Sequence, residues 1–174
     1  GDGNHSLATA KAYWEERKAA LTPRQRQDDP ARYCLVEVCN VHSPAIQIEP
    51  IHRVLFGVGA EQVRAALDGW AAANTICISP DSAQQFTLVS AAGDTPLGFA
   101  GEVEPLAVGT AERFVQDFLQ RCPGASVDYV HGEAAVRRLA AGGAVGLLMP
   151  PLQKADLFRG VVLGGVLPRK TFSM

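Results

Sequence analysis

The chain is 174 residues long, 47% of its residues are apolar, and 16 basic against 18 acidic residues give a formal net charge of −2. This length and composition suit one globular domain, and no dense run of Lys or Arg follows the spacing of a polyphosphate backbone, which excludes nucleic acid as an expected partner. No apolar stretch approaches the roughly 20 residues that cross a bilayer, and no signal-peptide pattern opens the sequence. We therefore expect a cytoplasmic protein with no membrane partner.

The first part of the chain combines a helical pattern with a polar stretch. Apolar residues recur at helical spacing over residues 6–21, which predicts an amphipathic helix with Asn4 or Ser6 as its N-cap. Residues 21–32 are polar and contain two prolines. Such a composition predicts a mobile loop.

Two apolar segments follow this loop. Residues 33–41 (YCLVEVCNV) are almost continuously apolar, which predicts a strand covered on both faces. Residues 46–56 come after a His-Ser-Pro turn and are expected to pair with it as a hairpin. The four cysteines lie in apolar surroundings and are expected to be buried thiols, with a disulfide as the open alternative.

The remaining sequence alternates helical patterns with short apolar strands. Helices are expected at 60–73, 110–122, 133–141 and 153–163, the second of them capped by Thr110; strands are expected at 75–79, 85–90, 96–99, 127–130 and 144–149. This alternation predicts an α/β or α+β fold, with helices packed on a mixed sheet. Because the first residue is Gly, we interpret residues 1–174 as a single-domain fragment of a longer protein, which leaves the sheet incomplete.

The opening residues form the first candidate site. Asp2-Gly3-Asn4-His5-Ser6 places a carboxylate, an amide and an imidazole at the start of the predicted helix. Unpaired N–H groups and the helix dipole favour an anion there, which predicts a phosphate or carboxylate site. The same residues also fit a plain Asp-Gly turn followed by an Asn or Ser cap, with His5 exposed.

The second candidate site is centred on His52. Strand alternation would place His52 on the same face as Val54 and Phe56, with Arg53 on the other side, towards solvent. Two alternatives stay open: a core histidine that is hydrogen-bonded to backbone, and a bulge at Pro50 that reverses the faces.

The end of the chain gives a less specific functional signal than the two candidate sites, and the Cys and His spacing gives no signal of a metal site. Lys170 lies among hydroxyl groups in a segment that fits either contact with an acidic ligand or a solvated tail. No Cys or His pair has the spacing of a structural zinc site, so we predict no metal ligands. The sequence contains no phosphate-loop or dinucleotide-binding motif.

Taken in order, the pieces GDGNHSLATAKAYWE, IEPIHRVLF, VDYVHG and LPRKTFSM resemble the bacterial and archaeal family called domain of unknown function 1015. The shared residues include Asp2, Gly3, His5, Pro50, His52, Arg53, Pro168, Lys170 and Thr171. The sequence departs from the commoner family pattern at Asn4 and Ser6, where His and Arg are usual. The Asp-Gly-x-His motif is also similar to the phosphate-binding turn of ParB/sulfiredoxin-like proteins, some of which are nucleotide-dependent kinases of free serine.

These resemblances imply a small-molecule phosphotransferase that acts on an amino acid such as serine, with a nucleotide and Mg²⁺ as cofactors. The catalytic residues would be Asp2, His5 and His52, and the residues that hold the anion or nucleotide would be Gly3, Asn4, Ser6, Arg53 and Lys170. The alternative is a non-catalytic ligand-sensing or protein-interaction domain. For either function we expect the fragment to form a homodimer or to exchange a strand with a second copy.

Overall fold

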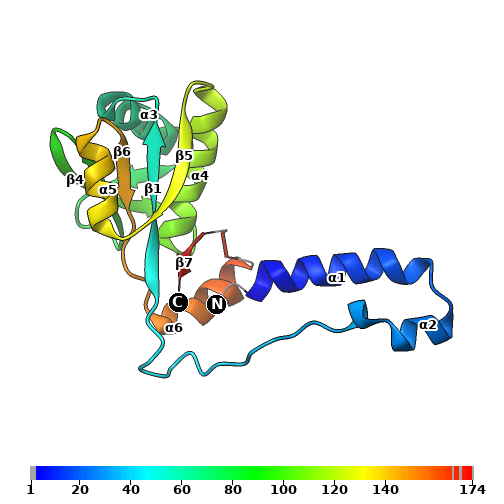
Figure 1. Cartoon of the computed structure of the whole chain (residues 1–174). Coiled ribbons are helices and arrows are strands. Elements are labelled where there is room, and N and C mark those ends of the chain that lie inside the picture. Colours follow the sequence, from blue (N-terminus) through cyan, green and yellow to red (C-terminus); the bar gives the residue numbers. More distant parts are fainter. Residues whose placement is uncertain (1–2, 166, 169, 174) are drawn as a thin grey trace. The chain divides into compact units, whose positions relative to one another are not determined.

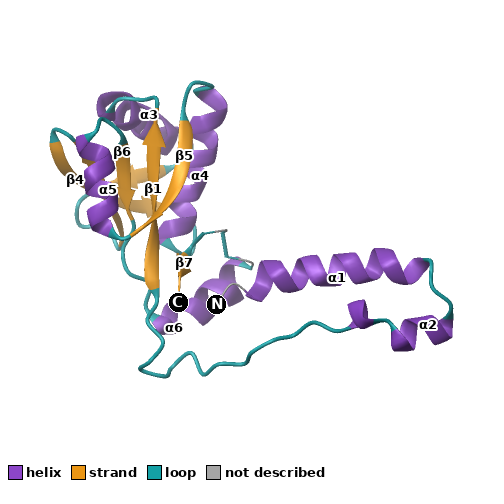
Figure 2. Cartoon of the chain, in the orientation of Figure 1, coloured by secondary structure: helices purple, strands orange, loops and turns teal. Residues whose placement is uncertain are grey.

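The computed structural model describes residues 3–165, 167, 168 and 170–173, and the side chains of Asn4 and His5 lie outside this description. The chain divides into two compact units, Gly1–Ile46 and Gln47–Met174. Figure 1 shows the course of the chain, and Figure 2 shows where helices and strands lie along it. Within the described residues, every helix is too short or too polar to span a bilayer.

The first unit is helical. It contains α1 (Gly3–Ala19), α2 (Pro23–Asp28) and the short 3-10 helix η1 (Pro30–Arg32). Because α1 begins at Gly3, Asn4 and Ser6 lie inside its first turn, and the prediction that either is the N-cap is wrong. None of the described side chains of α1 is buried, so the expected apolar face does not form a core within this unit.

Residues 21–32 are largely helical, although their polar composition predicts a loop. Thr22 and Gln25 form a reciprocal capping box, in which the side-chain oxygen Oε1 of Gln25 accepts from Thr22 N–H at 3.0 Å. Arg17 Nε donates to Asp29 Oδ2 at 2.9 Å, and Asp29 is only 8% exposed. The cap and the ion pair therefore replace the hydrogen bonds that a solvated loop would make to water.

Residues 33–41 form neither helix nor strand, so the predicted strand and its hairpin with residues 46–56 are wrong. Leu35 and Val38 are 101% and 94% exposed. A strand needs a neighbour that exchanges backbone hydrogen bonds with it, and no described strand pairs with this segment. Three of the four cysteines, Cys34, Cys39 and Cys77, are exposed, and all four are free, which corrects the expectation of buried thiols.

The second unit is built on one sheet of seven described strands in the order β2-β4-β3-β6-β1-β5, with β7 paired to β1. The strands are β1 (Glu49–Phe56), β2 (Ile76–Ile78), β3 (Gln84–Ser90), β4 (Gly93–Gly101), β5 (Ser126–His131), β6 (Val145–Leu148) and β7 (Phe172–Ser173). All pairings between described strands are antiparallel. The fold is therefore α+β, as one of the two predicted classes, with an antiparallel sheet in place of the expected mixed one.

Helices cover both faces of this sheet (Figure 2). Helices α3 (Ala60–Ala73) and α4 (Ala107–Arg121) enclose the larger apolar core on one face, which includes Leu55 of β1. On the other face, Val136 of α5 (Glu133–Ala141) packs on Val54. Helix α6 (Lys154–Gly164) leads towards β7. Adjacent residues of β1 therefore enter different cores, which buries the strand on both faces.

Helix boundaries agree with the sequence for α3 and α5, whereas α4 begins earlier than predicted. The expected N-cap Thr110 lies inside α4 and is 1% exposed. Its hydroxyl donates to Gln84 Oε1 at 2.7 Å and accepts from Glu104 N–H at 3.1 Å. The hydroxyl thus joins α4 to β3, a contact that local sequence cannot indicate.

Two glycines offer a matched test of how closely α5 approaches the sheet. A Cβ atom on Gly146 of β6 would lie 2.4 Å from Cγ1 of the fully buried Val136, whereas a Cβ on the exposed Gly69 of α3 would meet nothing within 4 Å. We expect Gly146→Ala to lower the free energy of unfolding by about 1–3 kcal/mol through overpacking. The same change at Gly69 should raise it by about 0.5–1 kcal/mol through helix propensity. Urea unfolding of both variants checks this, and a neutral Gly146→Ala would contradict the packing described.

Candidate functional site

The predicted site residues fall in both units. Asp2 lies outside the described residues, and Gly3, Asn4, His5 and Ser6 form the first turn of α1 in the first unit. His52 and Arg53 lie in β1, and Lys170 directly precedes the Thr171-β7 segment of the second unit. The placement of residues 3–6 at a helix start agrees with the sequence, and anion binding there stays a prediction.

His52 points to the α5 face of the sheet, where it is 5% exposed. Its Nδ1 atom accepts a hydrogen bond from Met149 N–H at 3.0 Å, so the ring proton of the neutral imidazole lies on Nε2. Burial lowers the pKa of His52, and the negative charge of Glu133 opposes this only in part. The contacts of His52 therefore match the alternative considered from sequence, a core histidine that is hydrogen-bonded to the backbone.

Arg53 points to the opposite face, but it does not reach solvent. Its side chain is 0% exposed, and Nε and Nη2 each lie 3.2 Å from Glu112 Oε2 of α4. Nη1 donates to the Ile51 carbonyl at 2.6 Å. The guanidinium carbon also lies 5.2 Å from the ring centre of Tyr129, its direct partner in the β1–β5 register.

Tyr129 and Glu112 complete this buried network, and sequence analysis missed both. Tyr129 Oη donates to Glu112 Oε1 at 2.8 Å, and Gln116 Nε2 donates to the same oxygen at 2.9 Å. Both oxygens of Glu112 are therefore occupied. The alternation of β5 could have indicated that Tyr129 faces a core, but Arg53 and Glu112 are 59 positions apart in the sequence, so no local pattern reveals the ion pair.

The start of β1 and the segment before β7, both of which resemble the family pattern in sequence, lie side by side in the second unit. Strand β7 pairs with the start of β1, with Phe172 opposite Pro50, and Ile51 N–H donates to the Thr171 carbonyl at 3.4 Å. Thr171 is 8% exposed and donates its hydroxyl proton to the Pro168 carbonyl at 2.6 Å. Lys170 is exposed and has a backbone φ of 58°. The segment is therefore tied to the sheet, which differs from the solvated tail considered from sequence.

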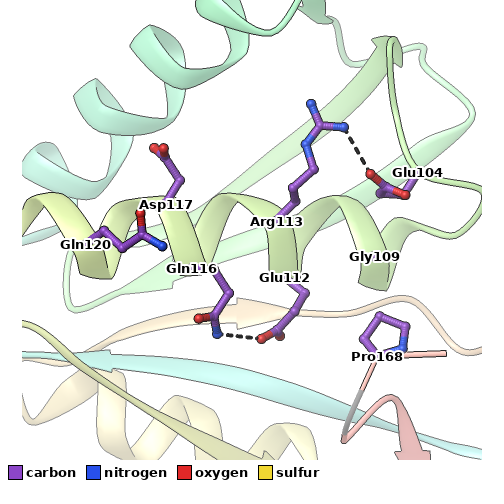
Figure 3. A pocket seen from close by; sticks show the side chains of 8 residues that line it. All are labelled: Glu104, Gly109, Glu112, Arg113, Gln116, Asp117, Gln120 and Pro168. Atoms are coloured by element: carbon purple, nitrogen blue, oxygen red, sulfur yellow. Dashed lines mark hydrogen bonds and ion pairs between the residues drawn. The ribbon is translucent and has the colours of Figure 1, made fainter. Parts of the chain in front are cut away.

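The described residues of the second unit form two hollows that bear on the candidate site. The first, of about 440 Å³, runs along the outer side of α4. Figure 3 shows its lining, with Glu112, Gln116 and Asp117 on the helix and Pro168 across from them. Here Arg113 is paired with Glu104 at 3.0 Å. No group of three or more His, Cys, Asp or Glu in the described residues is arranged to hold a metal ion.

The second hollow, of about 360 Å³, lies between the start of β3, the start of α4 and the segment that follows β6, and we call it the Pro150 pocket. Its apolar wall includes Leu106, Val108, Met149, Pro150, Pro151 and Leu152. Its polar lining includes Gln84, Gln85, Asp156 and Thr171. Met149 is also the backbone donor to His52, so the pocket borders the predicted His52 site.

With this α+β architecture, comparison with known proteins identifies the family. The family model described as "Protein of unknown function (DUF1015)" matches residues 1–116, and the chain belongs to this family. No curated protein matches the chain. A solved structure of a mutant free serine kinase in complex with AMP is similar over 79% of this chain, with a TM-score of 0.56 and 13% identity. This likeness shows the fold, and the chain spans 57% of the length of that kinase chain.

The Arg53–Glu112 pair predicts a strong response to removal of one charge. Glu112→Gln leaves the buried guanidinium without its counter-charge and should lower the free energy of unfolding by roughly 3–5 kcal/mol. Asp117→Asn is the control: it removes the carboxylate that pairs with Arg121 on the same helix, in a more exposed ion pair than Arg53–Glu112. It should lower the free energy of unfolding by about 0.5 kcal/mol or less. Denaturant unfolding of both variants checks this, and equal small losses would show that the buried pair does not hold α4 to β1.

The same network predicts a late titration of one tyrosine. Burial, followed by the contact with Glu112, raises the pKa of Tyr129 from 10.0 to about 12. Because the pKa is raised in the folded state, the stabilisation is complete below pH 10 and is lost as the pH rises towards 12. Phenolate absorbance of the folded chain should show one late component that Tyr129→Phe removes. A Tyr129→Phe titration curve with that component still present would contradict the assignment.

Proposed function

We propose that the protein containing this chain is a nucleotide-dependent phosphotransferase that acts on a small amino acid such as serine. The observation that carries the proposal is the fold likeness over 79% of the chain to a free serine kinase that holds AMP. The Asp-Gly-x-His sequence at the start of α1 supports it, because a helix N-terminus suits a phosphate group.

In the proposed reaction, the serine hydroxyl oxygen forms a bond to the terminal phosphorus of the nucleotide. The bond from that phosphorus to its bridging oxygen breaks, and the shortened nucleotide leaves with the electron pair. Asp2 accepts the hydroxyl proton, and His5 contacts the charge that develops on the transferred group. Mg²⁺, when bound to the nucleotide, would neutralise part of the phosphate charge.

The contacts of β1 change the roles that sequence assigns to its two residues. Arg53 has no exposed surface and is fully engaged with Glu112 and Ile51, so in the proposal it supports the fold and does not bind phosphate. His52 is held by Met149 N–H and borders the Pro150 pocket, where it positions the backbone that follows β6. Lys170 is exposed and stays assigned to phosphate.

The test is formation of O-phosphoserine from serine with Mg²⁺ and either ATP or ADP, followed by phosphorus NMR. Asp2→Ala and His5→Ala should each reduce the rate at least about a hundredfold, in line with loss of acid–base or charge-stabilising groups. Asp28→Ala and His42→Ala are matched controls, because both side chains are exposed in the same unit and lie outside the motif. They should retain the rate of the unaltered protein. No phosphoserine from either donor would overturn the proposal.

A non-catalytic ligand-binding domain is the second candidate function. It is favoured by the engagement of His52 and Arg53, the two family-matching side chains of β1, in contacts within the unit. This alternative predicts that nucleotide or amino acid binds without any turnover. The same assay, combined with calorimetric binding, separates the two candidates.

A further inference from the structure

The Pro150 pocket has the size and composition of a small-molecule site. At about 360 Å³ it lies within the range of roughly 300–1,000 Å³ that is typical of such sites. Its wall is mainly aliphatic, and a few polar groups are placed within it, which is how proteins orient a bound ligand. All of its lining belongs to the second unit, so the site is formed by one compact unit.

The apolar wall suits a flat ring. Pro150 and Pro151 have fixed backbone φ angles, and they line the hollow together with aliphatic side chains at the start of α4, among them Leu106 and Val108. Gln84 cannot turn into the space between them. Its amide group donates to the Glu104 carbonyl, and its carbonyl accepts from Thr110 at 2.7 Å. These hydrogen bonds therefore join β3 to α4 at the wall of the pocket.

Two polar side chains of the pocket indicate which hydrogen-bonding groups a bound ring system would need. Thr171 gives its only hydroxyl proton to Pro168, so towards a ligand its oxygen acts as an acceptor. Asp156 is half-buried; its backbone N–H donates to the Gln153 carbonyl at 2.9 Å, and among the described residues no hydrogen bond reaches its carboxylate. A carboxylate accepts two hydrogen bonds from a vicinal diol and repels phosphate. The lining thus matches a base with an exocyclic amine, joined to a ribose, with the phosphate directed away from Asp156.

We propose that the Pro150 pocket binds the nucleoside part of an adenine nucleotide, with Thr171 accepting from the adenine amine and Asp156 from the ribose hydroxyls. This inference rests on the proposed function and names the part of the chain that holds the nucleotide. Inosine monophosphate has a carbonyl in place of the amine, and it should bind more weakly than AMP because two acceptors would then face each other.

The test is calorimetric titration of the chain with AMP and ADP, using one variant that fills the pocket. Ala83 lines the pocket and is exposed, so Ala83→Phe places a ring in the pocket without entering the core. We expect it to weaken AMP binding at least about tenfold. Ala134→Phe, at an exposed position of α5 on the opposite face of the sheet, is the matched control and should leave AMP affinity unchanged.

A second variant tests the ribose contact and does not depend on how Ala83→Phe folds. Asp156→Asn should weaken AMP about tenfold, because a charged acceptor is lost, whereas Asp68→Asn on the surface of α3 should not. The unaltered chain should prefer AMP to 2′-deoxy-AMP, and Asp156→Asn should remove that preference. Thermal unfolding of each variant confirms that it is folded.

The outcomes separate this inference from the proposed function. If AMP binds equally well to the unaltered chain, to Asp156→Asn and to folded Ala83→Phe, the pocket assignment is wrong and the proposed function stands. If the unaltered chain binds neither AMP nor ADP, the inference is wrong, and the phosphoserine assay then decides the proposed function by itself.

Discussion

The second unit depends on the neutralisation of one charge that is out of contact with water. Arg53 lies in β1, between β6 and β5, and its guanidinium is held by Glu112 of α4, by Tyr129 of β5 and by the Ile51 carbonyl. A buried charge without such partners would cost several kcal/mol. These contacts fix α4 and β5 against β1, and the apolar core between α4 and the sheet forms under that constraint.

Strand β1 also provides the residues that pack on the opposite face of the sheet, against α5. His52 and Val54 point towards α5, and the histidine receives the backbone N–H of Met149 just beyond β6. Burial lowers the pKa of this histidine, which favours its neutral form on this face of the sheet. Strand β7 closes the start of β1 and brings Thr171 to the Pro150 pocket. One strand therefore links the ion pair, the second core and the pocket.

Sequence patterns predicted the elements whose partners are close along the chain. The bounds of α3 and α5 follow from local apolar spacing, and β3 and β4 are joined by a short turn. Residues 33–41 have an equally strong strand pattern, yet they form no strand, because pairing is a non-local event that composition does not encode. Arg53 shows the same limit, since alternation predicts its face but only Glu112, 59 residues away, determines whether that face can bury a charge.

Some residues that match a family motif support the fold and others could contact a ligand, and the burial and hydrogen bonds of each side chain distinguish the two kinds. All three guanidinium nitrogens of Arg53 donate to internal partners, so the side chain cannot move to the charge of a reacting group without leaving Glu112 unpaired. A group that handles a ligand needs unused hydrogen-bonding capacity, and in the lining of the Pro150 pocket the Asp156 carboxylate and the Thr171 hydroxyl oxygen retain it. Within the second unit of the proposed enzyme, β1 would therefore supply the rigid frame, and the pocket beside it would supply ligand contacts.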